Sequence, residues 1–256
     1  MIEQLSGVAR NVWVLLESRD EDLDIGGRLD VLLPALRAAA AAGDVGAQNV
    51  LGGVLLEVEE DPSAAAHWFE RAGAAGSVVG KRSLGHLYVN GLGVPQDLAK
   101  GEALIAAAAE GGDAYAQFNL AQLRWGTGDP QEAVLLLRNA ADGGVAEAYA
   151  PLGDLLAALG DDAAALRAYM AGAERGVTTA MHVAACWYRD GIVGRPDEET
   201  ALFWFFMMLG AGDADGVDAA LQMARTMTDE QIRSAGRRSG HTSEAEAMIG
   251  TVREYP

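Results

Sequence analysis

The chain of 256 residues has few of the side chains that most often carry chemistry. Cys186 is the only cysteine, which excludes an internal disulfide and a multi-cysteine metal site. The four histidines have no spacing typical of a zinc site; they are His67, His86, His182 and His241. A Gly-x-Ser-x-Gly nucleophile motif does not occur. We therefore expect no catalytic residue, no metal and no cofactor, and we expect that the protein is not an enzyme.

Long apolar runs and aromatic side chains are also scarce. Half of the residues are apolar, but aromatics make up only 6% and alanine and glycine dominate, which favours closely packed helices. The longest uncharged apolar stretch, residues 201–212, is too short to span a bilayer. The N-terminus is a poor signal peptide because Glu3 precedes only a short apolar run. We expect a soluble, cytoplasmic protein.

Basic residues are outnumbered, with 19 Lys and Arg against 37 Asp and Glu, for a net charge of −18. The five Arg from residue 225 onward match five acidic residues there, so the excess lies in residues 1–224. An acidic surface repels a phosphate backbone and argues against nucleic-acid binding. It would suit a basic protein or peptide partner, although solubility alone is the simpler interpretation.

Glycine is abundant and recurs at a fixed period. Gly43, Gly76, Gly112, Gly144, Gly176 and Gly212 are separated by 33, 36, 32, 32 and 36 residues. Small residues follow each glycine at the fourth position, and Leu or Ala follows at the eighth. Such self-similarity indicates an array of repeated structural units.

Aspartate recurs in the same register, fifteen residues before each of the last five glycines. The five are Asp61, Asp97, Asp129, Asp161 and Asp197. A side-chain carboxylate at the start of a helix accepts hydrogen bonds from free backbone N–H groups. Each unit is therefore predicted to contain two short helices, the second begun by the aspartate and ended by the glycine in a left-handed conformation.

The segment "LGHLYVNGLGVPQDLAK", residues 84–100, could be a phosphate-binding loop or a joint between helices. A phosphate loop follows a β-strand, whereas the first half of this segment has helical spacing. We interpret it as a joint.

This segment resembles a Sel1-like repeat, a relative of the tetratricopeptide repeat. The matching residues are Leu84, Gly85, Leu87, Tyr88, Gly91, Gly93, Val94, Asp97, Ala107, Ala108 and Gly111. The resemblance covers residues 43–212 as five repeats, and residues 213–256 as a terminal repeat with a capping helix. Residues 1–42 match poorly and are expected to be divergent capping helices. The resemblance implies an all-α fold, a right-handed α-α superhelix (solenoid) of antiparallel helix pairs with helical caps.

The caps at the two ends are expected as four helices. The first two are predicted near residues 3–17 and 28–42, with a charged loop at residues 18–27 between them. The last two are predicted near residues 228–238 and 242–253, with Thr228 and Gln231 as a capping box.

The resemblance also implies that the first helix of each repeat lines a concave groove, at three, six, ten and thirteen residues after the opening glycine. The resulting groove residues are Asn49, Arg82, His86, Tyr115, Phe118, Gln122, Trp125, Asp154, His182 and Arg189. Three aromatics from one repeat beside polar neighbours are typical of a binding hot spot. The alternative is that these aromatics pack on an adjacent helix.

Three functions are compatible with this pattern. The first is a non-catalytic adaptor that binds a protein or peptide in its groove, as the resemblance implies. The second is a homo-oligomeric scaffold associating through the apolar helix "ALFWFFMML" of residues 201–209, although that helix is better interpreted as buried. The third is a regulator that senses a small ligand.

Overall fold

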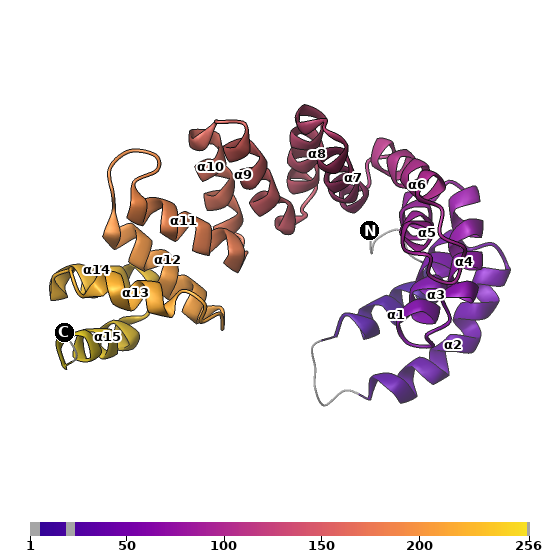
Figure 1. The fold of residues 1–256 in the computed structure, drawn as a ribbon. Helices are drawn as coiled ribbons and strands as arrows, with labels where there is room; N and C mark the ends of the chain where they lie inside the picture. The colour runs from indigo at the N-terminus through magenta and orange to yellow at the C-terminus, as the bar shows by residue number, and fades with distance from the viewer. Residues whose placement is uncertain (1–5, 19–23, 255–256) are drawn as a thin grey trace. The chain divides into compact units, whose positions relative to one another are not determined.

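The computed structural model describes residues 6–18 and 24–254, which form fifteen α-helices, one 3-10 turn and no β-strand. Over the described residues, the all-α prediction is confirmed. The chain divides into two compact units, residues 1–128 and residues 129–256, whose helices are labelled in Figure 1. The boundary falls within the third expected repeat, between its two helices.

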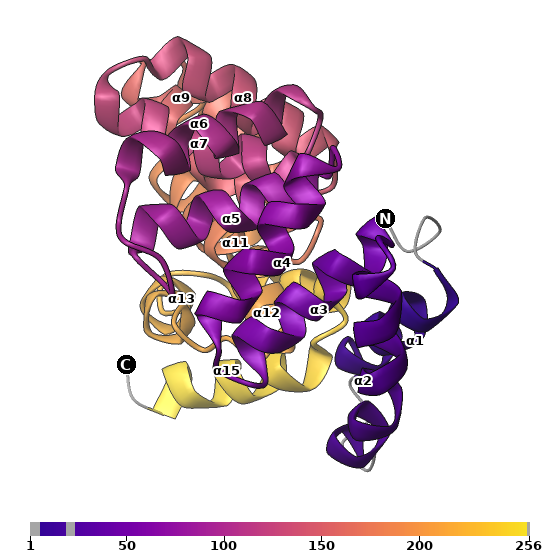
Figure 2. The same ribbon diagram turned by 90° about the vertical axis from the view of Figure 1, so that its right-hand side faces the viewer.

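In the first unit each helix packs against the next one along the chain, and α1 also packs against α3. Figure 2 shows α1 and α2 side by side at the N-terminal end of this unit. The helices are α1 (Gly7–Leu16), α2 (Ile25–Ala41), α3 (Val45–Glu57), α4 (Pro62–Ala74), α5 (Val78–Asn90), α6 (Leu98–Glu110) and α7 (Ala114–Thr127).

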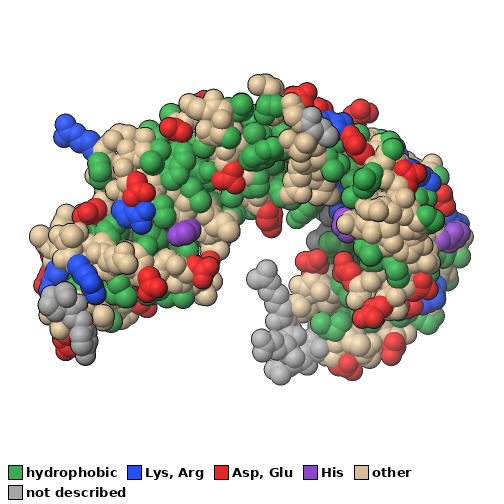
Figure 3. All heavy atoms as spheres, in the orientation of Figure 1, with side chains coloured by type: hydrophobic (Ala, Val, Ile, Leu, Met, Phe, Trp, Pro, Cys, Tyr) green, Lys and Arg blue, Asp and Glu red, His purple; other side chains and the backbone are tan. Residues whose placement is uncertain are grey.

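The second unit continues the pattern and ends in a small helical cap. Its elements are α8 (Pro130–Asp142), the 3-10 turn η2 (Ala146–Ala148), α9 (Tyr149–Ala158), α10 (Asp162–Ala173), α11 (Thr178–Asp190), α12 (Glu198–Gly210), α13 (Val217–Ala224), α14 (Asp229–Ser239) and α15 (Thr242–Glu254). Helix α14 packs on α12, and α15 packs on α13 and α14. On the face drawn in Figure 3, acidic side chains are scattered over both units and do not gather in one patch.

The predicted starts and ends of the repeat helices are confirmed. All five aspartates are N-caps; Asp129, for example, accepts from the backbone N–H of Glu132 at 3.0 Å. The six repeat glycines all have left-handed φ angles, from +81° to +97°. These local contacts satisfy backbone groups that helix ends leave free, so the repeat length is set by cap and turn chemistry.

The N-terminal cap differs from the prediction. Helix α2 begins at Ile25 and not near residue 28, because the Asp24 carboxylate accepts from the N–H of Gly27 at 2.9 Å and caps the helix there. Helix α1 begins at Gly7. The predicted helix start at residues 3–5 and five of the ten residues of the predicted charged loop, residues 19–23, lie outside the described residues.

The C-terminal cap follows the prediction within one residue at each end. Helices α14 and α15 cover residues 229–239 and 242–254, and Thr228 and Gln231 form the expected capping box. Helix α12 beneath them is buried on most of its circumference, with Leu202, Phe205 and Phe206 less than 5% exposed. The interpretation of "ALFWFFMML" as a buried helix is confirmed.

The joint between α5 and α6 packs on the start of α4. Gly91 ends α5 with a φ of +67°, and Gly93 has a φ of +68°. The Gly93 carbonyl accepts from the Ser63 hydroxyl at 2.9 Å, and a Cβ at Gly93 would lie 2.3 Å from the backbone carbon of Pro62. The segment follows a helix and presses on the start of α4, which is the arrangement expected of a joint.

Candidate functional site

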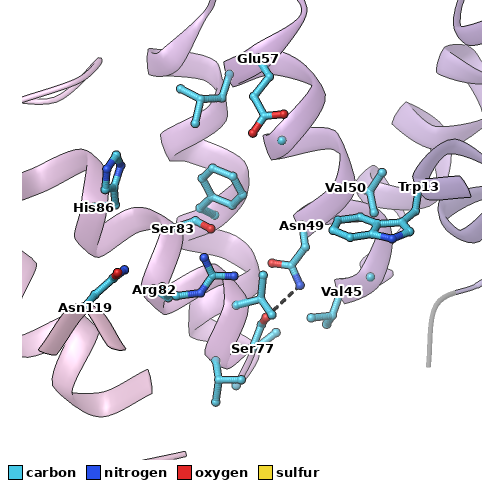
Figure 4. A pocket seen from close by; sticks show the side chains of 18 residues that line it. Trp13, Val45, Asn49, Val50, Glu57, Ser77, Arg82, Ser83, His86 and Asn119 are labelled. Atoms are coloured by element: carbon cyan, nitrogen blue, oxygen red, sulfur yellow. Dashed lines mark hydrogen bonds between the residues drawn. The ribbon is translucent and has the colours of Figure 1, made fainter. Parts of the chain in front are cut away.

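A pocket of about 810 Å³ lies in the first unit between α3 and α5 (Figure 4). Trp13 of α1 closes one side, and Asn119 of α7 lies on the other. Its apolar walls include Val45, Val50, Leu56, Phe69, Val78 and Val79, and its polar groups include Asn49, Glu57, Ser77, Arg82, Ser83 and His86. An open site of this size with apolar walls and a few polar groups can take side chains and backbone of another polypeptide.

The predicted helical stripe accounts for the central part of this lining. Asn49 lies on α3, between Gly46 and Gly53 of the same stripe, and all three line the pocket. Arg82 and His86 come from the equivalent positions of α5. Residues three or four positions apart share one helix face, so two parallel stripes meet in one space.

Asn49 presents an oxygen that has no partner. Its side-chain Nδ2 donates to the Ser77 hydroxyl at 2.8 Å, and that hydroxyl also accepts from the N–H of Gly80 at 3.0 Å as the cap of α5. Asn49 Oδ1 is buried without a hydrogen-bond partner among the described residues. A buried acceptor left without a donor destabilises the fold, so a donor at this oxygen would be stabilising. The oxygen has almost no accessible surface, so an incoming N–H or O–H group reaches it only after the side chains that cover it move.

Arg82 is held between an acidic side chain and an aromatic ring. Its Nε lies 2.9 Å from Asp113 Oδ1, and the two side chains are 22% and 8% exposed. The Nε–H is not directed at that oxygen, so the contact is an ion pair and not an aligned hydrogen bond. The Arg82 guanidinium carbon lies 5.5 Å from the centre of the Tyr115 ring. The positive charge of Arg82 is therefore largely compensated by its own unit.

Helix α7 contributes little to the pocket, although four of its residues are predicted to line the groove. Tyr115 and Trp125 are 49% and 43% exposed, Gln122 is exposed and Phe118 is half-buried. None of these four is among the described residues that line the pocket, whereas Asn119 is. Tyr115 reaches the site only through Arg82. The structure thus brings Asn49, Arg82 and His86 together and leaves Phe118, Gln122 and Trp125 on another part of α7.

The family model of the Sel1 repeat matches residues 39–77, 81–113, 114–145 and 178–213, together more than half of the sequence. The chain belongs to the Sel1 repeat family. The predicted resemblance is confirmed, and the four matches fall on α3–α4, α5–α6, α7–α8 and α11–α12. The unmatched residues 146–177 also form a helix pair, α9–α10, in which Asp161 caps the second helix.

Solved structures with a similar fold include other Sel1 repeat proteins. The crystal structure of a Sel1 repeat protein from Oxalobacter formigenes is 25% identical, with a TM-score of 0.68 over 97% of this chain and 100% of that one. The protective antigen c5321 of uropathogenic Escherichia coli is 18% identical, with a TM-score of 0.44 over 97% of this chain and 75% of that one. No curated protein matches the chain. Sel1 repeats generally mediate interactions between proteins.

The predicted groove residues of the second unit each have a contact within that unit. Asp154 accepts from the Tyr169 hydroxyl at 2.7 Å, and Arg189 donates to its neighbour Asp190 at 2.7 Å. His182 is half-buried, with its ring centre 6.1 Å from that of Phe205. Burial and the hydrogen bond to Asp154 raise the pKa of Tyr169, so this hydroxyl remains a donor. The role of these residues in partner binding remains a prediction.

Cys186 lies half-buried on α11, and burial raises the pKa of its thiol. A raised pKa lowers the thiolate fraction at neutral pH, which is the opposite of what a nucleophile needs. No group of three or more His, Cys, Asp and Glu side chains within residues 6–18 and 24–254 could hold a metal ion. No helix in the same described part of the chain is long and apolar enough to cross a membrane.

Several residues that line the pocket between α3 and α5 were not predicted from the sequence. Trp13 belongs to the N-terminal region that matches the repeat poorly, so no register placed it. Val50, Ser83 and Asn119 all lie seven residues after the opening glycine of their repeats. A stripe one position wider on each first helix would have included them, because positions three and seven lie on the same helix face.

Proposed function

We propose that this Sel1 repeat protein is a non-catalytic adaptor that binds a segment of another protein in the pocket between α3 and α5. The observation that carries the proposal is the pocket itself, which has apolar walls and the unpartnered oxygen of Asn49. The family supports it, since Sel1 repeats generally mediate protein interactions.

Gly53 provides a direct test, because it lines the pocket and a Cβ there would meet no atom within 4 Å. A Gly53→Leu variant should keep the fold and place an isobutyl group where the partner would lie. Ala103→Leu, on the exposed side of α6, adds a similar side chain away from the pocket. Proteins captured from native lysate by wild type and Ala103→Leu but lost from Gly53→Leu are the expected partners. The same proteins on all three would contradict the proposal.

Two aromatics of α7 that lie outside the pocket are tested separately. A Phe118→Ala/Trp125→Ala variant removes two apolar side chains that lie outside the pocket. If the predicted groove extends along α7, this variant loses the same partners as Gly53→Leu. Retention of those partners would confine the binding surface to the pocket.

Self-association is the alternative that the sequence left open. The helix expected to mediate it, α12, is covered by α11 and α14 within its own unit. No observation on the described residues favours a scaffold assembled through this helix, or a sensor of a small ligand, over the adaptor.

A further inference from the structure

The charged groups around the pocket carry information about the partner. Arg82 is the only Lys or Arg among the described residues that line it, and Asp113 compensates its charge at 2.9 Å. Glu57 also lines the pocket, is exposed, and has no ion pair among the residues that the structure describes. Among the described Lys, Arg, Asp and Glu side chains of the site and its immediate support, Glu57 therefore carries the one uncompensated charge.

The shape of the pocket favours an apolar side chain. Trp13 and Val50 lie on one side of the space (Figure 4), and Phe69 also lines it. On the α3 side Gly46 and Gly53 line the pocket without a side chain. At Gly53 a Cβ would meet nothing within 4 Å, so a partner's main chain can approach closely there. Burial of one aliphatic or aromatic side chain supplies most of the free energy that a short segment can gain here.

The hydrogen-bonding groups favour the backbone of an extended segment. Asn49 Oδ1 is held in place by the bond from Nδ2 to Ser77 and accepts from nothing in the described protein. A backbone N–H of the partner would satisfy this oxygen once the side chains that cover it move aside. A carboxylate would not, because it brings a second acceptor to an acceptor that already lacks a donor.

We infer, on the basis of the proposed function, that the pocket binds an extended internal segment that inserts an apolar side chain and carries a Lys or Arg beside Glu57. Acidic segments and free C-terminal carboxylates are rejected. The rejection depends on Asp113, because without its carboxylate Arg82 would attract anions into the same space.

Asp113 can be neutralised without loss of its structural role. It caps α7 by accepting from the N–H of Ala116 at 2.7 Å, and Asn caps helices as well as Asp does. Asp113→Asn therefore preserves the cap and leaves Arg82 without its counter-ion. Glu57→Gln removes the other charge at constant volume, and Glu60→Gln, an exposed neighbour that does not line the pocket, is its matched control.

The experiment selects a phage-displayed library of random dodecapeptides on the immobilised full chain. Wild type and Glu60→Gln should enrich an apolar residue with a nearby Lys or Arg, and Gly53→Leu should abolish the enrichment. Asp113→Asn should shift the selection toward Asp and Glu. For one selected synthetic peptide, Glu57→Gln should weaken binding about fivefold. A second peptide carries Glu in place of the basic residue. The Asp113→Asn protein should bind this acidic peptide about tenfold more tightly than the wild-type protein does.

The outcomes separate this inference from the proposed function. Enrichment of acidic peptides by wild type, or identical selections by wild type and Asp113→Asn, would overturn the inference while leaving a peptide-binding pocket. Absence of any enrichment that Gly53→Leu removes would overturn both. A thermal melt of each variant shows whether Asp113→Asn is folded. Glu57→Gln changes an exposed side chain, so it tests the charge preference independently of any folding defect at Asp113.

Discussion

Gly52 and Gly53 are adjacent on α3 and have opposite environments. A Cβ at Gly52 would lie 2.5 Å from the Phe69 ring, whereas one at Gly53 would meet nothing within 4 Å. Gly52→Ala should therefore destabilise the first unit by about 1–3 kcal/mol through overpacking. Gly53→Ala should stabilise it by up to about 1 kcal/mol, because alanine loses less backbone entropy in a helix. Urea unfolding of both variants measures whether each change lowers or raises the free energy of unfolding.

The same arrangement recurs in the second unit, where a Cβ at Gly153 would lie 2.4 Å from the Tyr169 ring. Gly153→Ala should be destabilising for the same reason. If Gly52→Ala and Gly53→Ala had equal effects, helix propensity alone would decide them, and the close contact with Phe69 would carry no energetic weight.

Asp129 caps α8 through its bond to the N–H of Glu132, and an Asp129→Ala variant loses that bond. The expected cost is about 1 kcal/mol of unfolding free energy. Asp142 at the other end of α8 is exposed and lies at the negative end of the helix dipole. Asp142→Ala should be neutral or slightly stabilising, so the melting temperature should fall for Asp129→Ala and stay unchanged or rise slightly for Asp142→Ala. Equal melts would contradict the capping role.

Features that depend on a few neighbouring residues could be predicted from the sequence, and contacts between distant residues could not. The Asp caps and left-handed glycines are local and repeat five or six times, so their register was unambiguous. The pairing of Arg82 with Asp113 joins two repeats. Asp113 has a counterpart in Asp44, which caps α3 in the same register, but no other repeat has a basic residue of fixed charge at the position of Arg82. Asn119 was missed because the expected stripe was too narrow by one position.

At the scale of helices, the repeated pairs were predicted and the N-terminal cap was placed less well. Helix α2 starts three residues earlier than expected because Asp24 caps it, while the repeat register pointed to residue 28. Cap helices have one neighbour in the array and are released from the repeat pattern, so the period carries no information there. For the same reason, the contribution of Trp13 to the pocket could not be read from the repeat.

The C-terminal helices protect the most apolar helix of the chain. Phe206 of α12 is 1% exposed, with its ring stacked at 6.4 Å on that of His241, and Glu199 of α12 accepts from Ser234 of α14 at 2.6 Å. A chain ending at Met227 lacks this cover and exposes several large apolar side chains as one patch. We expect its mass in light scattering to rise with concentration more steeply than that of the full chain. An identical concentration dependence would show that α14 and α15 are dispensable as a cover.

For the whole molecule, the balance between like-charge repulsion and ion pairs decides how stability depends on salt. The net charge is −18. Most of the recorded ion pairs are on exposed side chains, such as Arg237–Glu230 at 55% and 73% exposure, and each contributes about 0–1 kcal/mol. Repulsion among the excess carboxylates acts over longer distances and is screened as the Debye length falls from about 20 Å to about 7 Å between 0.02 and 0.2 M salt.

We therefore expect the urea midpoint of unfolding to rise between 0.02 and 0.2 M NaCl, by an amount equivalent to about 1 kcal/mol. KCl should give the same rise, because screening depends on ionic strength and not on the identity of the cation. A midpoint that falls with salt would mean that the ion pairs outweigh the repulsion. In that case the ion pair between Arg82 and Asp113 is the first to remove. Its side chains are only 22% and 8% exposed, so salt screens it less than the exposed pairs.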